Sequence, residues 1–146
     1  MDQNILLLSI RHHYAVKLFA GTKKVELRRI KPKLNPGDIV VVYVSSPVKA
    51  VAGFFVVQEI IQSVPTELWD QVKDLAGISK YEFEKYYDNS RCAWGIVLKK
   101  FKYFEPPLAL EYLRLNWKNF SPPQSYKYLK YHDWEYISQM AEQYRG

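Results

Sequence analysis

A lysine, a glutamate and an arginine lie close together in the segment Gly21-Thr-Lys-Lys-Val-Glu-Leu-Arg28. Because side chains alternate across a strand, Glu26 and Arg28 share a face there, and we expect Lys24 to join them. Lys23 precedes the strand and is expected to lean over the same cleft. Such cations bind a phosphate, and the carboxylate accepts a hydrogen bond from a base amino group. The same residue types also suit a structural ion-pair network, so both interpretations stay open.

The surroundings of this segment are strongly basic. The chain carries a formal net charge of +6, and the stretch 11–33 holds eight basic residues but a single acid, Glu26. The basic residues are Arg11, Lys17, Lys23, Lys24, Arg28, Arg29, Lys31 and Lys33. A local field of this sign concentrates phosphate-bearing ligands and gives salt-sensitive binding. The alternative is a solvated basic face without a partner.

The common catalytic motifs are absent. The sequence has no Gly-x-x-x-x-Gly-Lys-Ser/Thr, Gly-x-Gly-x-x-Gly, Gly-x-Ser-x-Gly or His-Glu-x-x-His pattern. His12, His13 and His132 lack metal-ligand spacing, and Cys92 stands in an apolar segment typical of a core strand. We therefore expect neither a metal nor a cofactor.

Length and composition indicate one globular domain. A chain of 146 residues with 48% hydrophobic content can bury a core of its own. A single cysteine allows no intramolecular disulfide, which favours a reducing compartment. The apolar run that follows Met1-Asp-Gln-Asn4 is too short for a leader or a membrane span. We expect a cytoplasmic protein with no membrane partner.

Hydrophobic periodicity predicts the elements that position these side chains. Strands are expected at 5–10, 24–28, 39–44, 48–61 and 92–104, with a bulge or a close backbone approach at Gly53. Helices are expected at 14–20, ending at Gly21, from about Pro65, from the capping box Ser79-Lys-Tyr-Glu82, and at 134–144 with Asp133 as N-cap. Pro106-Pro107 and Pro122-Pro123 argue against long regular elements around them. The order predicts an α+β domain around a mainly antiparallel, curled sheet.

The segment from Gly21 to Arg28 matches Gly-x-Lys-x-x-Glu-x-Arg, and by this motif the chain resembles the ASCH domain family. Further similarity lies at Ser9-Ile10, Tyr14-Ala15, Gly37-Asp38, Tyr43-Val-Ser-Ser-Pro47 and Gly53, and the likeness covers roughly residues 6–98. The resemblance implies a PUA-like mixed or antiparallel β-barrel with flanking helices. It implies a single domain over 1–146, with a core of about 5–104 and a proline- and tyrosine-rich extension at 105–146.

The family resemblance also implies a ligand cleft between the first helix and the barrel rim, facing the loop after Tyr43. The candidate binding residues are Lys23, Lys24, Glu26, Arg28, Arg29, Tyr43, Ser45 and Ser46. Lys23 and Glu26 are the candidates for catalysis. Some similar proteins are amidohydrolases that deacetylate a modified cytidine with a lysine, a threonine and a carboxylate, and others are ribonucleases. Glu26 stands where the threonine would be, and the carboxylate would fall near Ala76-Gly77.

The tyrosines of the extension add a weaker indication. Tyr126, Tyr128 and Tyr131 alternate with Lys127 and Lys130, and stacking on tyrosine beside cations is a common way to hold single-stranded RNA. The rings also suit a second layer of the core.

We therefore predict a domain that binds RNA or a modified nucleotide in a basic cleft. The alternatives are a metal-independent RNA-processing enzyme, either a ribonuclease or a nucleoside amidohydrolase, and a regulatory protein-interaction module.

Overall fold

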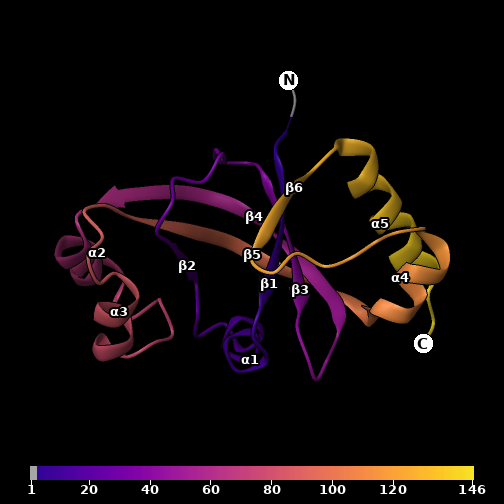
Figure 1. Cartoon of the computed structure of the whole chain (residues 1–146), viewed down its shortest axis with the longest axis horizontal. Helices are drawn as coiled ribbons and strands as arrows, with labels where there is room; N and C mark the ends of the chain where they lie inside the picture. The colour runs from indigo at the N-terminus through magenta and orange to yellow at the C-terminus, as the bar shows by residue number, and fades with distance from the viewer. Residues whose placement is uncertain (1–2) are drawn as a thin grey trace.

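The computed structural model describes residues 3–146 and builds them around one sheet (Figure 1). The strands are β1 (Ile5–Ile10), β2 (Val25–Arg28), β3 (Ile39–Val44), β4 (Ala50–Ser63), β5 (Ala93–Ala109) and β6 (Tyr126–Leu129). The helices are α1 (His12–Ala20), α2 (Pro65–Val72), α3 (Lys80–Tyr86), α4 (Leu110–Asn116) and α5 (Tyr131–Gln143). None of these helices is long and apolar enough to cross a membrane.

The sheet is mixed and has the strand order β2-β5-β4-β3-β1-β6. Only β1 and β3 run parallel, and the other pairs are antiparallel, as the sequence predicted. The strands curl into a half-barrel, with β2 and β6 as its edges. Figure 1 shows α2 and α3 at one end of the long β4–β5 ribbon and α4 and α5 at the other.

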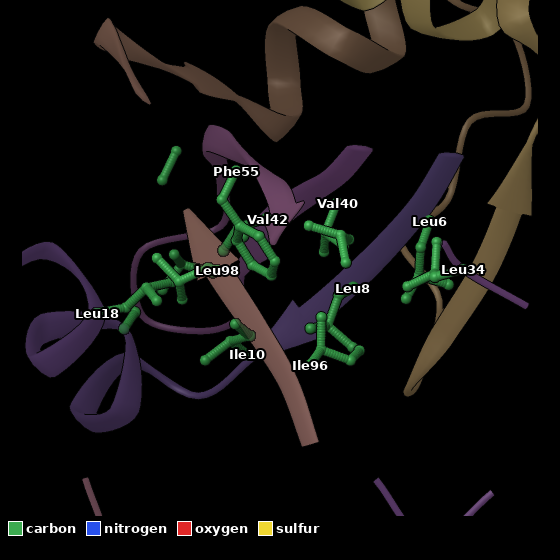
Figure 2. Close-up of a cluster of buried hydrophobic side chains, with 14 residues drawn as sticks. Leu6, Leu8, Ile10, Leu18, Leu34, Val40, Val42, Phe55, Ile96 and Leu98 are labelled. Atoms are coloured by element: carbon green, nitrogen blue, oxygen red, sulfur yellow. The ribbon is translucent and has the colours of Figure 1, made fainter. Parts of the chain in front are cut away.

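The central strands are buried on both faces, which explains their nearly continuous apolar sequences. Leu6, Leu8 and Ile10 of β1 point into a cluster completed by α1, which Figure 2 shows in close-up. Ile5 and Leu7 point the opposite way, into a cluster that α4 and α5 cover. A third cluster packs α2 and α3 against β2. The two-sided packing fixes β1, and with it the start of α1.

The predicted C-terminal end of α1 and the predicted start of α3 are confirmed. Gly21 has φ of 80° and caps α1, because its backbone N–H reaches back to the carbonyl of Leu18. Ser79 and Glu82 form the predicted capping box of α3, with the Glu82 N–H donating to Ser79 Oγ at 3.1 Å.

Gly53 lies at an irregularity of both sheet pairings of β4, as predicted. The register shifts between Val51 and Gly53 against β5, and Gly53 has φ of 153°. A Cβ at this position would lie 2.0 Å from the carbonyl oxygen of Lys102. Only glycine therefore allows the two strands to approach this closely.

The structure corrects three predictions in the second half of the chain. β5 runs on through Pro106 and Pro107 to Ala109. Tyr103 pairs with Gly53 and Leu108 with Val51, so residues 104–107 lie opposite Ala52 alone. Because both prolines fall in this unpaired stretch, they remove no ladder hydrogen bond.

The other two corrections concern the extension. It supplies α4 and the edge strand β6, neither of which was predicted. α5 begins at Tyr131, and Asp133 is its third residue instead of its N-cap. Its carboxylate accepts from the backbone N–H of Lys130 at 3.1 Å, which places the start of the helix three residues earlier.

Candidate functional site

A cavity of about 230 Å³ lies where the end of β1, helix α1, strand β2 and helix α3 meet. Its charged lining consists of Arg11, Lys23, Glu26 and Glu82. Ser9, Tyr14 and Tyr86 supply hydroxyl groups to the same walls. The cavity therefore combines two carboxylates with two cations, and its lining is mixed in charge instead of purely basic.

Lys23 is the buried member of this set, with 4% of its surface exposed. Its Nζ donates to the carbonyl of Val25 at 2.8 Å and to that of Ala76 at 3.0 Å, and lies 3.3 Å from Glu26 Oε1. Two of the three donors of the ammonium group are thus held by backbone carbonyls, and its charge lies against the carboxylate of Glu26. Lys23 thus fixes the charge of Glu26 in the cavity wall and is itself anchored by two backbone carbonyls.

Glu26 is a half-buried carboxylate on the face of β2 that lines the cavity. Lys23 fixes one oxygen, and Arg28 Nη1 lies 3.9 Å from the other. Alternation along β2 puts Glu26 and Arg28 on one face, as the sequence predicted. This carboxylate is positioned to accept a hydrogen bond or a proton inside the cavity.

A second carboxylate lies across the cavity on α3. Tyr14 Oη donates to Glu82 Oε2 at 3.0 Å, while Glu82 Oε1 accepts from the backbone N–H of Ser79. The hydrogen bond from Ser79, with that from Tyr14, lowers the pKa of Glu82. Burial and the neighbouring Glu82 raise the pKa of Tyr14, which stays protonated at neutral pH.

Two predicted cations pack against aromatic rings at the rim. Arg28 lies 5.0 Å from the ring centroid of Tyr126 and donates to Ser125 Oγ at 3.1 Å. Arg29 lies 4.8 Å from the ring centroid of Tyr86. These contacts place the guanidinium groups over aromatic rings at the edge of the sheet.

The remaining predicted residues lie outside the cavity. Lys24 precedes β2 and lines a separate groove, so it does not join Glu26 as expected. Tyr43 is buried on the opposite face of the sheet, among the side chains packed under α4 and α5, and this burial raises its pKa. Ser45 Oγ donates to the carbonyl of Ile10, and Ser46 is exposed beyond it.

Sequence reasoning did not select Ser9, Arg11, Tyr14, Glu82 or Tyr86 as site residues. Ser9 and Tyr14 had a signal, because both belong to the family-like positions at the start of the chain. Glu82 was visible only as half of a capping box, a structural role that it combines with lining the cavity.

Ala76 and Gly77, near which the family resemblance would place a carboxylate, offer backbone carbonyls instead. Ala76 accepts from Lys23, and Gly77 accepts from Lys17 Nζ at 2.6 Å. No cluster of three or more His, Cys, Asp or Glu side chains that could hold a metal ion occurs within residues 3–146.

Comparison with known proteins places this arrangement in a family. The model of the ASCH domain matches residues 8–107. A ribonuclease of Zymomonas mobilis that contains an ASCH domain is 26% identical over 142 residues, which cover 97% of this chain and 95% of that protein.

Solved structures show the same fold. The crystal structure of the ASCH protein from Zymomonas mobilis superposes with a TM-score of 0.86 and 26% identity, covering 94% of this chain and 96% of that one. A hypothetical protein from Leishmania major superposes with a TM-score of 0.62 at 17% identity, over 97% and 96% of the two chains. Both likenesses extend over the whole half-barrel and its flanking helices.

Proposed function

The chain belongs to the ASCH domain family, and from this premise we propose that it binds single-stranded RNA and holds one nucleotide in the cavity between α1, β2 and α3. The observation that carries the proposal is the ion pair of buried Lys23 with half-buried Glu26, in which two backbone carbonyls anchor the lysine beside the carboxylate. Burying a charged pair is costly unless its hydrogen bonds are satisfied. A carboxylate held in this way in a cavity wall suits recognition of a base amino group.

The rim supports the same ligand. Arg11 is exposed beside the cavity, and Arg29 stacks on Tyr86 at its edge. Guanidinium groups bind phosphate in a bidentate manner, and aromatic faces stack on unpaired bases. The full-length similarity to a ribonuclease agrees with an RNA ligand. Membership of the PUA-like superfamily, which the half-barrel suits, is part of the proposal.

The test of binding is fluorescence polarisation with a labelled single-stranded RNA of mixed sequence, at two salt concentrations. Wild-type protein should bind in a salt-dependent manner, and Arg11→Gln should weaken binding by about tenfold, the effect of losing one charge-assisted contact. Arg91→Gln, at an exposed arginine outside the cavity, is the matched control. Absence of binding at physiological salt contradicts the proposal and leaves the protein-interaction module as the explanation.

A second candidate function is metal-independent cleavage of that RNA, favoured by the position of Glu26 and by the relative's activity. In this reaction the 2′-oxygen attacks the adjacent phosphorus, and Glu26 takes the 2′-hydroxyl proton. The bond from phosphorus to the 5′-oxygen breaks, and that oxygen takes a proton from water. The products are a 2′,3′-cyclic phosphate and a 5′-hydroxyl end. Arg11 is the cation placed to balance the negative charge on the non-bridging phosphoryl oxygens.

Cleavage and binding separate in one experiment. Glu26→Gln should abolish cleavage, whereas RNA should still bind, more weakly, because the amide oxygen accepts a hydrogen bond without the charge. A chelator should leave the wild-type rate unchanged. Melting curves of both proteins identify loss through unfolding. RNA that stays intact with wild-type protein rules out this second candidate but leaves the binding proposal standing.

A further inference from the structure

A groove of about 490 Å³ lies on the far side of Lys23 from the cavity. It runs between the C-terminal end of α1 and the outer parts of β4 and β5. Lys23 contributes to the walls of both hollows, so the groove directly adjoins the proposed nucleotide site.

The groove differs from the cavity in its charge. Lys24, Lys99 and Lys100 line it and are exposed, and none of its lining residues is an aspartate or a glutamate. Within residues 3–146 none of these three lysines forms an ion pair. Three uncompensated ammonium groups in one hollow give a strongly positive field, which favours a polyanion.

Two bulges turn the side chains into the groove. Val57 pairs with Leu98 and Phe55 with Phe101, so β5 carries one extra residue at Lys99-Lys100. Strict alternation would direct one of this pair towards the core, whereas both are exposed.

The second bulge lies on the other strand. Glu59 pairs with Val97 and Val57 with Leu98, which leaves Gln58 of β4 as an extra residue, exposed in the same groove. The two irregularities lie side by side and together supply an amide and two ammonium groups. Bulges that re-aim side chains in this way are common beside functional sites.

An aromatic surface completes the groove. Tyr103 is 51% exposed, donates a hydrogen bond to the carbonyl of Phe19, and contacts the ring of Phe101 edge-on with centroids 4.9 Å apart. These contacts hold the tyrosine ring in place, where its exposed surface can stack on an unpaired base.

We propose that this groove binds the phosphate backbone of the same single-stranded RNA, in the nucleotides next to the one in the cavity. The inference rests on the proposed function and extends it. Phosphates contact Lys24, Lys99 and Lys100, and one base stacks on Tyr103. The cavity selects a nucleotide, and the groove supplies affinity that is independent of sequence.

The test uses a 12-nucleotide single strand with 2′-fluoro riboses, which keeps its phosphates but lacks the 2′-hydroxyl needed for cleavage. The dissociation constant is measured by fluorescence polarisation from low to high salt for wild type and for Lys24→Gln/Lys99→Gln/Lys100→Gln. Each lost phosphate contact removes about 0.7 from the slope of log K against log salt, so the slope should fall by about 2. Binding of a labelled mononucleotide, which reaches only the cavity, should stay unchanged.

The matched control is Lys73→Gln/Lys85→Gln/Lys118→Gln, which removes the same charge from exposed lysines outside the cavity and the groove. Its slope should stay close to that of wild type. An equal fall in both triple variants would mean that only net charge matters and would overturn the inference. An unchanged slope in the groove variant, with RNA still bound, overturns this inference alone. Absence of RNA binding by wild type is the failure of the proposed function itself.

A measurement on wild-type protein removes the risk that the triple variant fails to fold. Lysine acetylation, read by mass spectrometry, should show Lys24, Lys99 and Lys100 protected by the 12-nucleotide strand and Lys73 unprotected. Protection by an acidic polyglutamate peptide but not by RNA would assign the groove to an acidic protein partner and overturn the inference.

Discussion

Arg28 on β2 donates a hydrogen bond of 3.1 Å to Ser125 Oγ, immediately before β6, and so joins the two edges of the sheet. The sheet order leaves these edges without a ladder between them. The same guanidinium lies over the ring of Tyr126 and near Glu26. Side chains therefore close the half-barrel, and they do so beside the cavity.

Replacing Arg28 with lysine tests this closure. Lysine keeps the charge but cannot lie flat over Tyr126 while it donates to Ser125. We expect the free energy of unfolding in urea to fall by about 1 kcal/mol. Hydrogen exchange of the β6 amides should also become faster. Arg91→Lys, at an exposed arginine, is the control. Unchanged exchange in β6 would show that its ladder to β1 alone holds the edge.

A double-mutant cycle tests the support that Lys23 gives to Glu26. Lys23→Met leaves the half-buried carboxylate of Glu26 without its ion-pair partner and two buried carbonyls without their donor, and we expect a loss of about 3 kcal/mol in urea unfolding. Glu26→Gln removes the charge that the lysine neutralises. The double variant should lose less than the sum of the two, because the pair acts as a unit. Lys24 is exposed, so Lys24→Met should change the free energy of unfolding little. Additive losses would contradict the coupling.

Much of this site could be predicted from local sequence. Alternation along β2 placed Glu26 and Arg28 on one face, and the capping box at Ser79 located the start of α3. These features depend on neighbours a few residues apart, where periodicity and cap chemistry are informative.

The features that sequence reasoning missed depend on residues far apart in the chain. Ser125 meets Arg28 across 97 positions, and Glu82 meets Tyr14 across 68. Lys24 illustrates a different limit, because its exposure fits the alternation but it lies just before the strand and lines the groove instead of the cavity. Neither the closing of the sheet nor the ends of its strands can be read from side-chain period alone.

Gly53 provides a test of the close approach between β4 and β5. In Gly53→Ala the new Cβ would meet the Lys102 carbonyl at 2.0 Å, so one strand must move. We expect a loss of about 3 kcal/mol from this clash and the unfavourable φ. Gly21→Ala is the control, because its φ is also positive but nothing lies within 4 Å of the added atom. It should cost about 1 kcal/mol. Equal losses in urea unfolding would show that φ alone matters at Gly53.

The buried hydroxyl of Tyr87 should make the free energy of unfolding depend on pH in the alkaline range. It is 4% exposed and donates to the carbonyl of Arg28 at 3.1 Å. Burial raises its pKa far above the usual value of 10.0, and the charges of Tyr86 and Glu26 add to the effect. The unfolded chain therefore loses this proton near pH 10 while the folded protein keeps it. The stability contribution is complete below pH 10 and is lost as the pH rises towards the folded pKa, at about 1.4 kcal/mol per pH unit.

Tyr87→Phe should therefore make the alkaline loss shallower. At neutral pH the variant should be about 1 kcal/mol less stable, because the carbonyl of Arg28 loses its donor. Between pH 10 and 11.5 the free energy of unfolding should fall less steeply for the variant than for wild type. The two slopes should differ by about 1.4 kcal/mol per pH unit. Urea unfolding at a series of pH values measures both effects. Tyr131→Phe, at a half-exposed tyrosine, should follow wild type. Parallel curves for Tyr87→Phe and wild type would place the alkaline sensitivity elsewhere, since a phenylalanine carries no proton to lose.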